Sequence, residues 1–196
     1  MVKNIYIIKY LSPWMMDELI AFSQIAHYKI IFLRKRYSIE FPEEYYQAGF
    51  QQLRSNGIDI VEKLFVLNHI VRKLLIVFRL LYKNILKFGP NYNSVIGIKS
   101  IICFLGLDLS KFSQHSKIHA QFATQAAIIS LLIKQFYNNK PEYSFTFHAH
   151  DIYFNNTWFN VLVSNCQQAF SISNYNIDYV KNNFYILFGR KHILLI

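Results

Sequence analysis

Short apolar runs typical of buried β-strands alternate with helical stretches along most of this chain. The pattern is clearest in the second half, where strand-like runs at 117–122, 143–148 and 169–173 are separated by helical stretches. Chains that alternate in this way form a mostly parallel sheet, because each crossover helix returns the chain to the same edge. The sequence therefore predicts an α/β fold with helices on both faces of a mostly parallel sheet.

The first half of the chain and its end continue this alternation. Further strands are expected at 2–10, 29–33, 58–61 and 192–196, and further helices at 13–25, 42–55, 63–88, 95–107, 123–137, 157–166 and 176–183. Ser12 followed by Pro13 is a typical helix start, with serine as the N-cap and proline just inside. A length of 196 residues suits one domain, so residues 1–196 are expected to form a single unit.

Composition and cysteine usage indicate a cytosolic protein. Hydrophobic residues make up 53% of the chain. The best candidate for a membrane-spanning helix, 95–107, is nevertheless too short to cross a bilayer and contains Lys99. The N-terminus lacks the features of a signal peptide. Cys103 and Cys166 are isolated in apolar surroundings, which favours buried thiols over a disulfide framework.

The net charge of +10 invites an anionic partner, and one helical stretch concentrates the basic residues. Between residues 63 and 88 there are six Lys and Arg and no acid, and on a helical wheel Arg72, Arg79, Lys83 and Lys87 share one stripe. Leu67, Leu74, Phe78, Leu81 and Ile85 lie opposite. This basic amphipathic helix is interpreted either as a solvated face on a core-packed helix or as an attachment site for the anionic inner face of the cell membrane. Nucleic acid is a poorer partner, because no nucleic-acid-binding motif is found.

Histidines mark the ends of two of the predicted strands. His148 and His150 close the strand at 143–148 and would point to the same side of an extended chain, Asp151 follows them, and His119 ends the strand before. Ser173 ends the third strand. Three interpretations remain open: polar strand ends satisfied by the backbone, a zinc or iron site made by the three histidines and Asp151, and a crevice for a sugar or phosphate.

Motifs for other chemistries are missing from the sequence. H-x-H alone is a weak metal signal, and neither E-x-x-H nor a cysteine supports it, so no metal ligand is assigned. There is no Walker loop, no G-x-G-x-x-G and no G-x-S-x-G. We therefore expect no bound cofactor and no serine nucleophile.

Three segments in the second half resemble successive motifs of the family-4 glycosyltransferases. They are KIHAQFA at 117–123, FTFHAHDIY at 145–153 and FSISNYN at 170–176. They are similar to H-x-H-F-A, S-F-T-x-H-A-x-D-I-Y and I-S-x-x-N in the bacterial branch that makes exopolysaccharide, capsule or lipopolysaccharide. Order and spacing both fit, and the likeness is specific between residues 118 and 179.

This resemblance implies a GT-B enzyme, in which two Rossmann-like domains enclose the active site. The chain resembles the N-terminal, acceptor-side domain, a three-layer α/β unit, and has no segment like the donor-binding domain with its paired glutamates. By position, His148 matches the histidine that faces the donor sugar, and is the expected catalytic residue. His119, His150, Asp151 and Ser173 are expected to bind substrate, with Asp151 orienting its loop.

Two positions depart from the family pattern. Gln121 stands where the second histidine is expected, and Ser12-Pro13-Trp14 replaces the glycine-rich turn of many relatives. The second departure puts a backbone contact to the donor phosphates in question.

The expected function is therefore transfer of a sugar from a nucleotide-sugar donor to a lipid-linked or glycan acceptor in cell-surface polysaccharide synthesis, with retention of configuration. Without a donor domain, the chain alone is expected to be inactive, as a truncated part of a longer enzyme. One alternative is a non-catalytic accessory subunit at the membrane surface, which binds acceptor or a separate donor domain. A metal-dependent hydrolase is the third.

Overall fold

The computed structural model describes residues 3–9, 11–33, 41–62, 66, 68–88, 94–153, 158–183 and 192–195. Seven parallel strands form one sheet in the order β3-β2-β1-β4-β5-β6-β7. The strands are β1 (Lys3–Ile8), β2 (Tyr28–Phe32), β3 (Asp59–Glu62), β4 (Ser116–Gln121), β5 (Glu142–Phe147), β6 (Gln168–Ser171) and β7 (His192–Leu195). The predicted α/β class is confirmed, and the arrangement is a Rossmann-like three-layer fold.

Helices connect the strands in sequence. They are α1 (Pro13–Ser23), α2 (Glu43–Ser55), α3 (Ile70–Phe88), α4 (Ser94–Leu105), α5 (Gln125–Phe136), α6 (Ala149–Tyr153), α7 (Phe159–Asn165) and α8 (Asn174–Asn183), with a 3-10 turn at Leu109–Lys111. The short helix α6 was not expected from the sequence. None of the helices within the described ranges is both long and apolar enough to cross a membrane.

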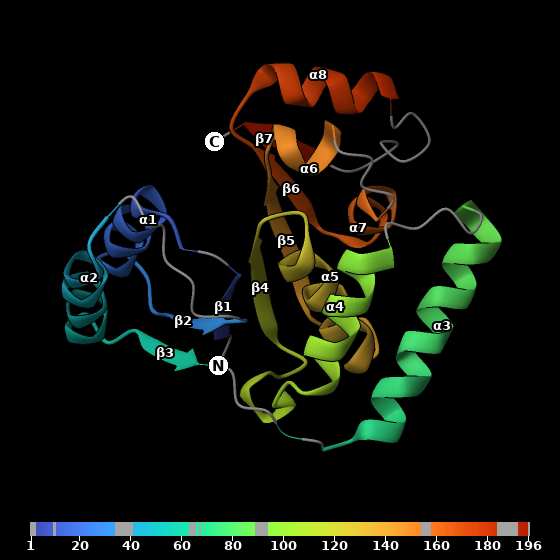
Figure 1. The fold of residues 1–196 in the computed structure, drawn as a ribbon, viewed down its shortest axis with the longest axis horizontal. Helices are drawn as coiled ribbons and strands as arrows, with labels where there is room; N and C mark the ends of the chain where they lie inside the picture. Colours follow the sequence, from blue (N-terminus) through green and yellow to red (C-terminus); the bar gives the residue numbers. More distant parts are fainter. Residues whose placement is uncertain are drawn as a thin grey trace.

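The sheet separates two layers of helices (Figure 1). On one face α1 and α2 cover β1, β2 and β3, and on the other α5 covers the centre of the sheet, with α3, α4 and α7 packed against α5. Strand order reverses between β1 and β4, because the chain crosses from one half of the sheet to the other after β3. Open α/β sheets bind ligands at the carboxyl ends of strands beside such a reversal.

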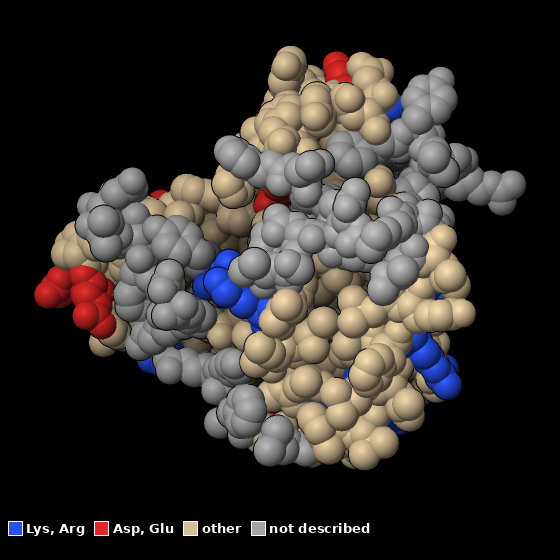
Figure 2. Space-filling view, turned by 45° about the vertical axis from the view of Figure 1, so that its right-hand side comes forward, with Lys and Arg blue, Asp and Glu red and all other residues tan. Residues whose placement is uncertain are grey.

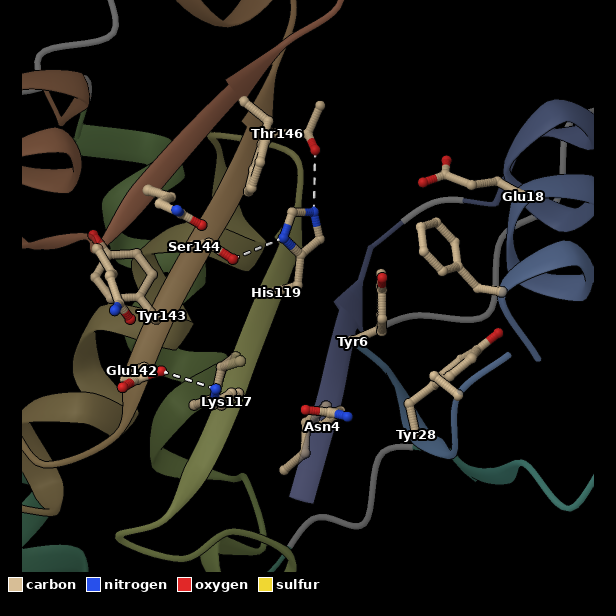
Figure 3. A pocket seen from close by; sticks show the side chains of 17 residues that line it. Asn4, Tyr6, Glu18, Tyr28, Lys117, His119, Glu142, Tyr143, Ser144 and Thr146 are labelled. Carbon is tan, nitrogen blue, oxygen red and sulfur yellow. Dashed lines mark hydrogen bonds and ion pairs between the residues drawn. The ribbon is translucent and has the colours of Figure 1, made fainter. Parts of the chain in front are cut away.

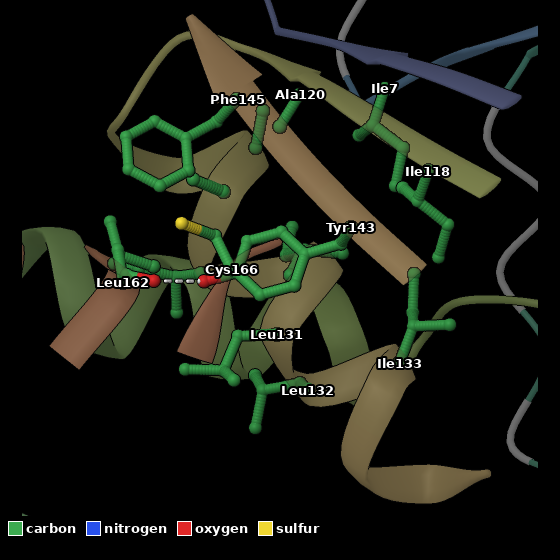
Figure 4. Packing of buried hydrophobic residues seen from close by; sticks show 14 of the residues in the cluster. Ile7, Ile118, Ala120, Leu131, Leu132, Ile133, Tyr143, Phe145, Leu162 and Cys166 are labelled. Carbon is green, nitrogen blue, oxygen red and sulfur yellow. Dashed lines mark hydrogen bonds between the residues drawn. The ribbon is translucent and has the colours of Figure 1, made fainter. Parts of the chain in front are cut away.

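The larger core lies between the sheet and α5 (Figure 4). Helix α5 is buried along nearly its whole length, since it contacts strands on one side and α3, α4 and α7 on the other. Tyr143 extends from β5 into this core, where its hydroxyl donates to the carbonyl oxygen of Leu162 in α7. An all-round apolar helix next to a parallel sheet explains the high hydrophobic content without a membrane segment.

Helix α1 begins as its sequence predicts. The Ser12 side chain accepts a hydrogen bond from the backbone N–H of Met15 at 3.4 Å, and Pro13 occupies the first turn. Met15 and Leu19 are buried as expected. Phe22 and Ile25 are exposed, and Ile25 lies beyond the end of the helix at Ser23.

Candidate functional site

The carboxyl ends of β4 and β5 lie side by side next to the start of α1, and His148 is the first residue after β5. Its ring contacts Phe122, at a centroid separation of 4.3 Å, and Trp14, at 5.8 Å. These two aromatic side chains follow β4 and β1. The imidazole of His148 therefore lies where the segments that follow β1, β4 and β5 come together.

The imidazole of His148 has one unsatisfied nitrogen. Nε2 is shielded from solvent and has no hydrogen-bond partner among the described residues. Burial lowers the pKa of His148 below its usual value, so the ring is neutral near physiological pH. Buried polar atoms are nearly always paired in folded proteins, and an unpaired one is a candidate contact for a ligand.

Asp151 fixes the loop that carries His148. Its carboxylate accepts the backbone N–H of His148 at 2.8 Å and also the backbone N–H of Ala123, which follows β4. The backbone N–H of Asp151 donates in turn to the His148 carbonyl at 3.0 Å, so the two residues form a reciprocal cap on α6. Burial raises the pKa of Asp151 to about 6. One buried side chain thus ties together the segments after β4 and β5.

His150 does not join His148. The strand ends at Phe147, and His150 lies in α6 with an exposed side chain. The expectation that both histidines point to the same side is wrong, because the chain turns into a helix immediately after His148. His150 therefore sits beside the site without facing it.

Ser173 lies at the third strand end, between β6 and α8. Its carbonyl accepts the backbone N–H of Ile177 and the hydroxyl of Ser171, and its own N–H donates to that hydroxyl at 3.3 Å. These contacts fix the backbone at the start of α8. No described residue bonds the Ser173 hydroxyl, which leaves it available to a ligand.

His119 is not at a strand end. It occupies the middle of β4, paired in register with Tyr6 and Ser144, and its ring hydrogen-bonds the hydroxyls of Ser144 at 2.9 Å and Thr146 at 3.1 Å (Figure 3). The predicted position was wrong because β4 continues two residues beyond the histidine. Burial lowers the pKa of His119 to about 4, so the ring stays neutral.

Gln121 takes the strand-end position that His119 was expected to hold. It is the last residue of β4, and its side-chain oxygen Oε1 is buried without a hydrogen-bond partner among the described residues. Gln121 pairs in register with Thr146, two residues before His148. In-register partners share a face of the sheet, so Gln121 and Thr146 point to the same side. The sequence showed Gln121 only as a departure from a motif, whereas the structure places it at the end of the strand next to the one that His148 follows.

The interpretation of these residues as a metal site has no support in the described ranges. No three His, Cys, Asp or Glu side chains within them lie together in a way that could hold a metal ion. Both ring nitrogens of His119 are already bonded to hydroxyls.

The second predicted site, on α3, differs from the expected amphipathic helix. Arg79 and Lys83 are exposed, and the side chain of Lys87 lies outside the described residues. Arg72 is held against α5, where its guanidinium donates to the Phe136 carbonyl at 2.6 Å and lies 4.4 Å from the centre of that ring. Arg72 is nevertheless exposed, so the three stripe residues whose side chains are described all reach solvent.

Lys73, the neighbour of Arg72, is fully buried. Its Nζ donates to the carbonyl oxygens of Leu105 and Leu107, each at 2.9 Å, and to Asn68 Oδ1 at 3.2 Å. Burial lowers the pKa of this lysine, while the charge of Asp108 opposes the shift. A lysine that satisfies carbonyls at the end of α4 locks the two helices together.

The apolar side of α3 is largely exposed among the described residues, whereas one of the two interpretations of this helix packs it in the core. Ile76, Val77 and Leu80 are buried, whereas Leu74 and Phe78 are not. Side chains that are more than half exposed come from both α3 and its neighbour α4: Val71, Leu75, Phe78, Tyr82, Leu86, Ile98 and Ile102. With this side turned forward, Figure 2 shows a mostly uncharged surface with a few basic side chains. We call these seven residues, with Arg79 and Lys83, the α3 surface.

Comparison with known proteins identifies no family for this chain. No protein-family model matches the sequence. No curated protein matches it either.

Proposed function

We propose that this chain is the acceptor-side domain of a GT-B glycosyltransferase, with the sugar-transfer site at the carboxyl ends of β4, β5 and β6. The observation that carries the proposal is the buried, unpaired Nε2 of His148 at the end of a parallel strand. The three motifs that resemble family-4 glycosyltransferases support it, since all three fall on these strands and the segments after them.

The residues at this edge suit recognition of a sugar. A neutral imidazole nitrogen can exchange one hydrogen bond with a sugar hydroxyl, and the aromatic rings of Trp14 and Phe122 exclude water around it. Asp151 holds the backbone of His148 in place, so the ring is positioned before a ligand arrives. In this role His148 contacts the transferred sugar, and Asp151 positions it.

A GT-B site also needs a second, donor-binding domain, in the same polypeptide or in another. The test is incubation of the chain with labelled nucleotide-sugars and a membrane extract as acceptor, with and without a donor domain encoded beside it. We expect product only when the donor domain is added. Product formed by the 196-residue chain alone would refute the two-domain proposal.

Matched histidine variants then assign the site. His148→Ala loses no hydrogen bond at Nε2, so we expect near-normal stability and a large loss of rate. His115→Ala, an exposed histidine in the segment before β4, is the control and should keep full activity. Full activity of a folded His148→Ala protein would remove this residue from the site.

Attachment to an anionic membrane is the second part of the proposal, and the α3 surface favours it. Exposed apolar side chains next to Arg79 and Lys83, on a helix with no acidic residue, match the features of helices that lie in the membrane interface. In this role the apolar side chains enter the lipid boundary and the basic ones meet lipid phosphates. A non-catalytic accessory subunit would use the same surface.

Vesicle co-sedimentation tests this attachment. Binding should favour anionic over neutral vesicles, and changing Arg79 and Lys83 to glutamine should weaken it by roughly tenfold or more, at about 1 kcal/mol for each charge. Phe78→Ser should weaken binding to both kinds of vesicle. Lys140→Gln, an exposed lysine outside the α3 surface, is the control. Equal binding by all four proteins would refute the assignment.

A further inference from the structure

A separate pocket of about 580 Å³ lies on the face of the sheet that carries α1 (Figure 3). Helix α1 forms one wall, and β1, β4, β5 and β6 form the floor. Glu142 and Gln168, the first residues of β5 and β6, are among the lining residues, so the pocket lies toward the amino ends of the strands. This volume falls within the range of small-molecule sites, about 300–1,000 Å³.

The floor of the pocket offers hydroxyl groups with unused hydrogen-bonding capacity. A neutral imidazole has one donor and one acceptor nitrogen, so His119 donates to one of the hydroxyls of Ser144 and Thr146 and accepts from the other. The hydroxyl that accepts keeps its own proton to donate, and both keep free lone pairs. The floor therefore presents both donors and acceptors, which is the pattern that a ligand hydroxyl group matches.

The neighbouring strand β1 and the α1 wall add two polar groups and aromatic surface. Tyr6 lies on β1 beside His119, Glu18 lies on α1, and neither side chain has a hydrogen-bond partner among the described residues. Phe22 and Phe170 add ring faces to the lining. Burial raises the pKa values of the Tyr6 hydroxyl, to about 12, and of the Glu18 carboxyl. These groups are desolvated and lack described partners, as expected for the lining of a binding site.

The charges of the pocket decide which ligands fit. Its lining includes Glu18, Glu142 and Lys117, and the lysine lies 3.6 Å from the carboxylate of Glu142. Among the lining residues that the structure describes, no second cation offsets Glu18. Phosphates and other anions are therefore disfavoured, and an uncharged ligand rich in hydroxyl groups is favoured.

We propose that this pocket binds a neutral mono- or disaccharide, through the hydroxyls of Ser144 and Thr146 on β5, the hydroxyl of Tyr6 on β1 and the carboxyl group of Glu18 on α1. The aromatic rings supply apolar faces for the sugar rings. The site is distinct from the strand-end site around His148, and its existence does not depend on the proposed sugar transfer.

Protein NMR with ¹⁵N-labelled full chain tests the proposal. The probes are glucose, galactose, mannose, N-acetylglucosamine, maltose, cellobiose and lactose, each titrated through the millimolar range, with uridine diphosphate as the anionic comparison. We expect at least one sugar to give saturable shifts centred on β4 and β5 near His119, and uridine diphosphate to give none there.

Two conservative variants locate the ligand. Tyr6→Phe and Glu18→Gln should each weaken binding about tenfold, the effect of losing one hydrogen bond of about 1.4 kcal/mol. Neither side chain has a described partner, so both variants should fold normally. Tyr175→Phe on α8 and Glu44→Gln on α2, both exposed, are the matched controls and should bind as the parent chain does.

Four results would overturn the proposal. They are no saturable shift with any of the seven sugars, shifts confined to the segments around His148, unchanged affinity in Tyr6→Phe and Glu18→Gln, and pocket shifts that follow protein concentration without added sugar. The last result would show that a second copy of the chain covers this face. None of them affects the test of the strand-end site, which is measured by sugar transfer.

Discussion

Acidification should destabilise this protein through His119, and replacing that residue isolates the effect. The folded state holds the pKa of His119 at about 4, below the ordinary value of 6.5, because the ring is buried. Between these two values the unfolded chain binds more protons than the folded one, so stability is lost as pH falls. From pH 7.5, the loss amounts to about 2 kcal/mol at pH 5 and about 3 kcal/mol at pH 4.

Other buried groups titrate in the same range with the opposite sign. The pKa of Asp151 is raised to about 6, so its folded form takes up a proton first and gains stability as pH falls. The pKa of Glu18 is also raised by burial. The pH profile of the wild-type protein alone would therefore underestimate the contribution of His119.

A comparison with His119→Gln removes this interference, because both proteins retain the two acids. Urea denaturation followed by tryptophan fluorescence, with the buried Trp158 as reporter, gives the free energy of unfolding at each pH. We expect the wild-type protein to lose about 3 kcal/mol relative to His119→Gln between pH 7.5 and pH 4. A constant difference across this range would show that the His119 ring does not resist protonation, and would refute the reasoning.

Three further predictions concern stability, each measured by urea denaturation at neutral pH. Lys73→Met leaves two carbonyl oxygens without their donor and should cost about 2–4 kcal/mol, whereas the exposed Lys83→Met should change stability by less than about 0.5 kcal/mol. Asp151→Ala removes the acceptor of two backbone N–H groups and should cost about 2–4 kcal/mol. Gly49→Ala places a Cβ 2.5 Å from the sulfur of Met16, which is fully buried, and should cost about 1–3 kcal/mol unless Met16 is shortened as well.

The sequence predicted the fold well because the relevant signals are local. Apolar strands, the Ser12-Pro13 helix start and the turns between elements each depend on a few neighbouring residues, and all seven strands lie within two residues of their expected positions. The short helix α6 was missed, because residues 148–151 look like the end of a strand in the sequence. In the structure, the hydrogen bond from His148 N–H to the Asp151 carboxylate starts a helix there.

The candidate site was predicted less completely, because side-chain direction depends on where a strand ends. Strand β4 continues two residues beyond His119, which leaves this histidine inside the strand and puts Gln121 at its end. Helical periodicity put Leu74 and Phe78 on the apolar side of α3, but periodicity alone cannot show whether a neighbouring element covers that side. Lys73 looked like a surface lysine, and only the carbonyl oxygens at the end of α4 explain its burial.

The anchoring of α3 by Lys73 and Arg72 has a geometric consequence. Lys73 joins this helix to the end of α4, and Arg72 joins it to the end of α5, whose other face packs on the sheet. If the protein bound a bilayer through the α3 surface, its orientation would thus be fixed, with His148 at a constant distance from the lipid headgroups. Acceptors would then be selected by the length of their polar portion, which would have to match that distance.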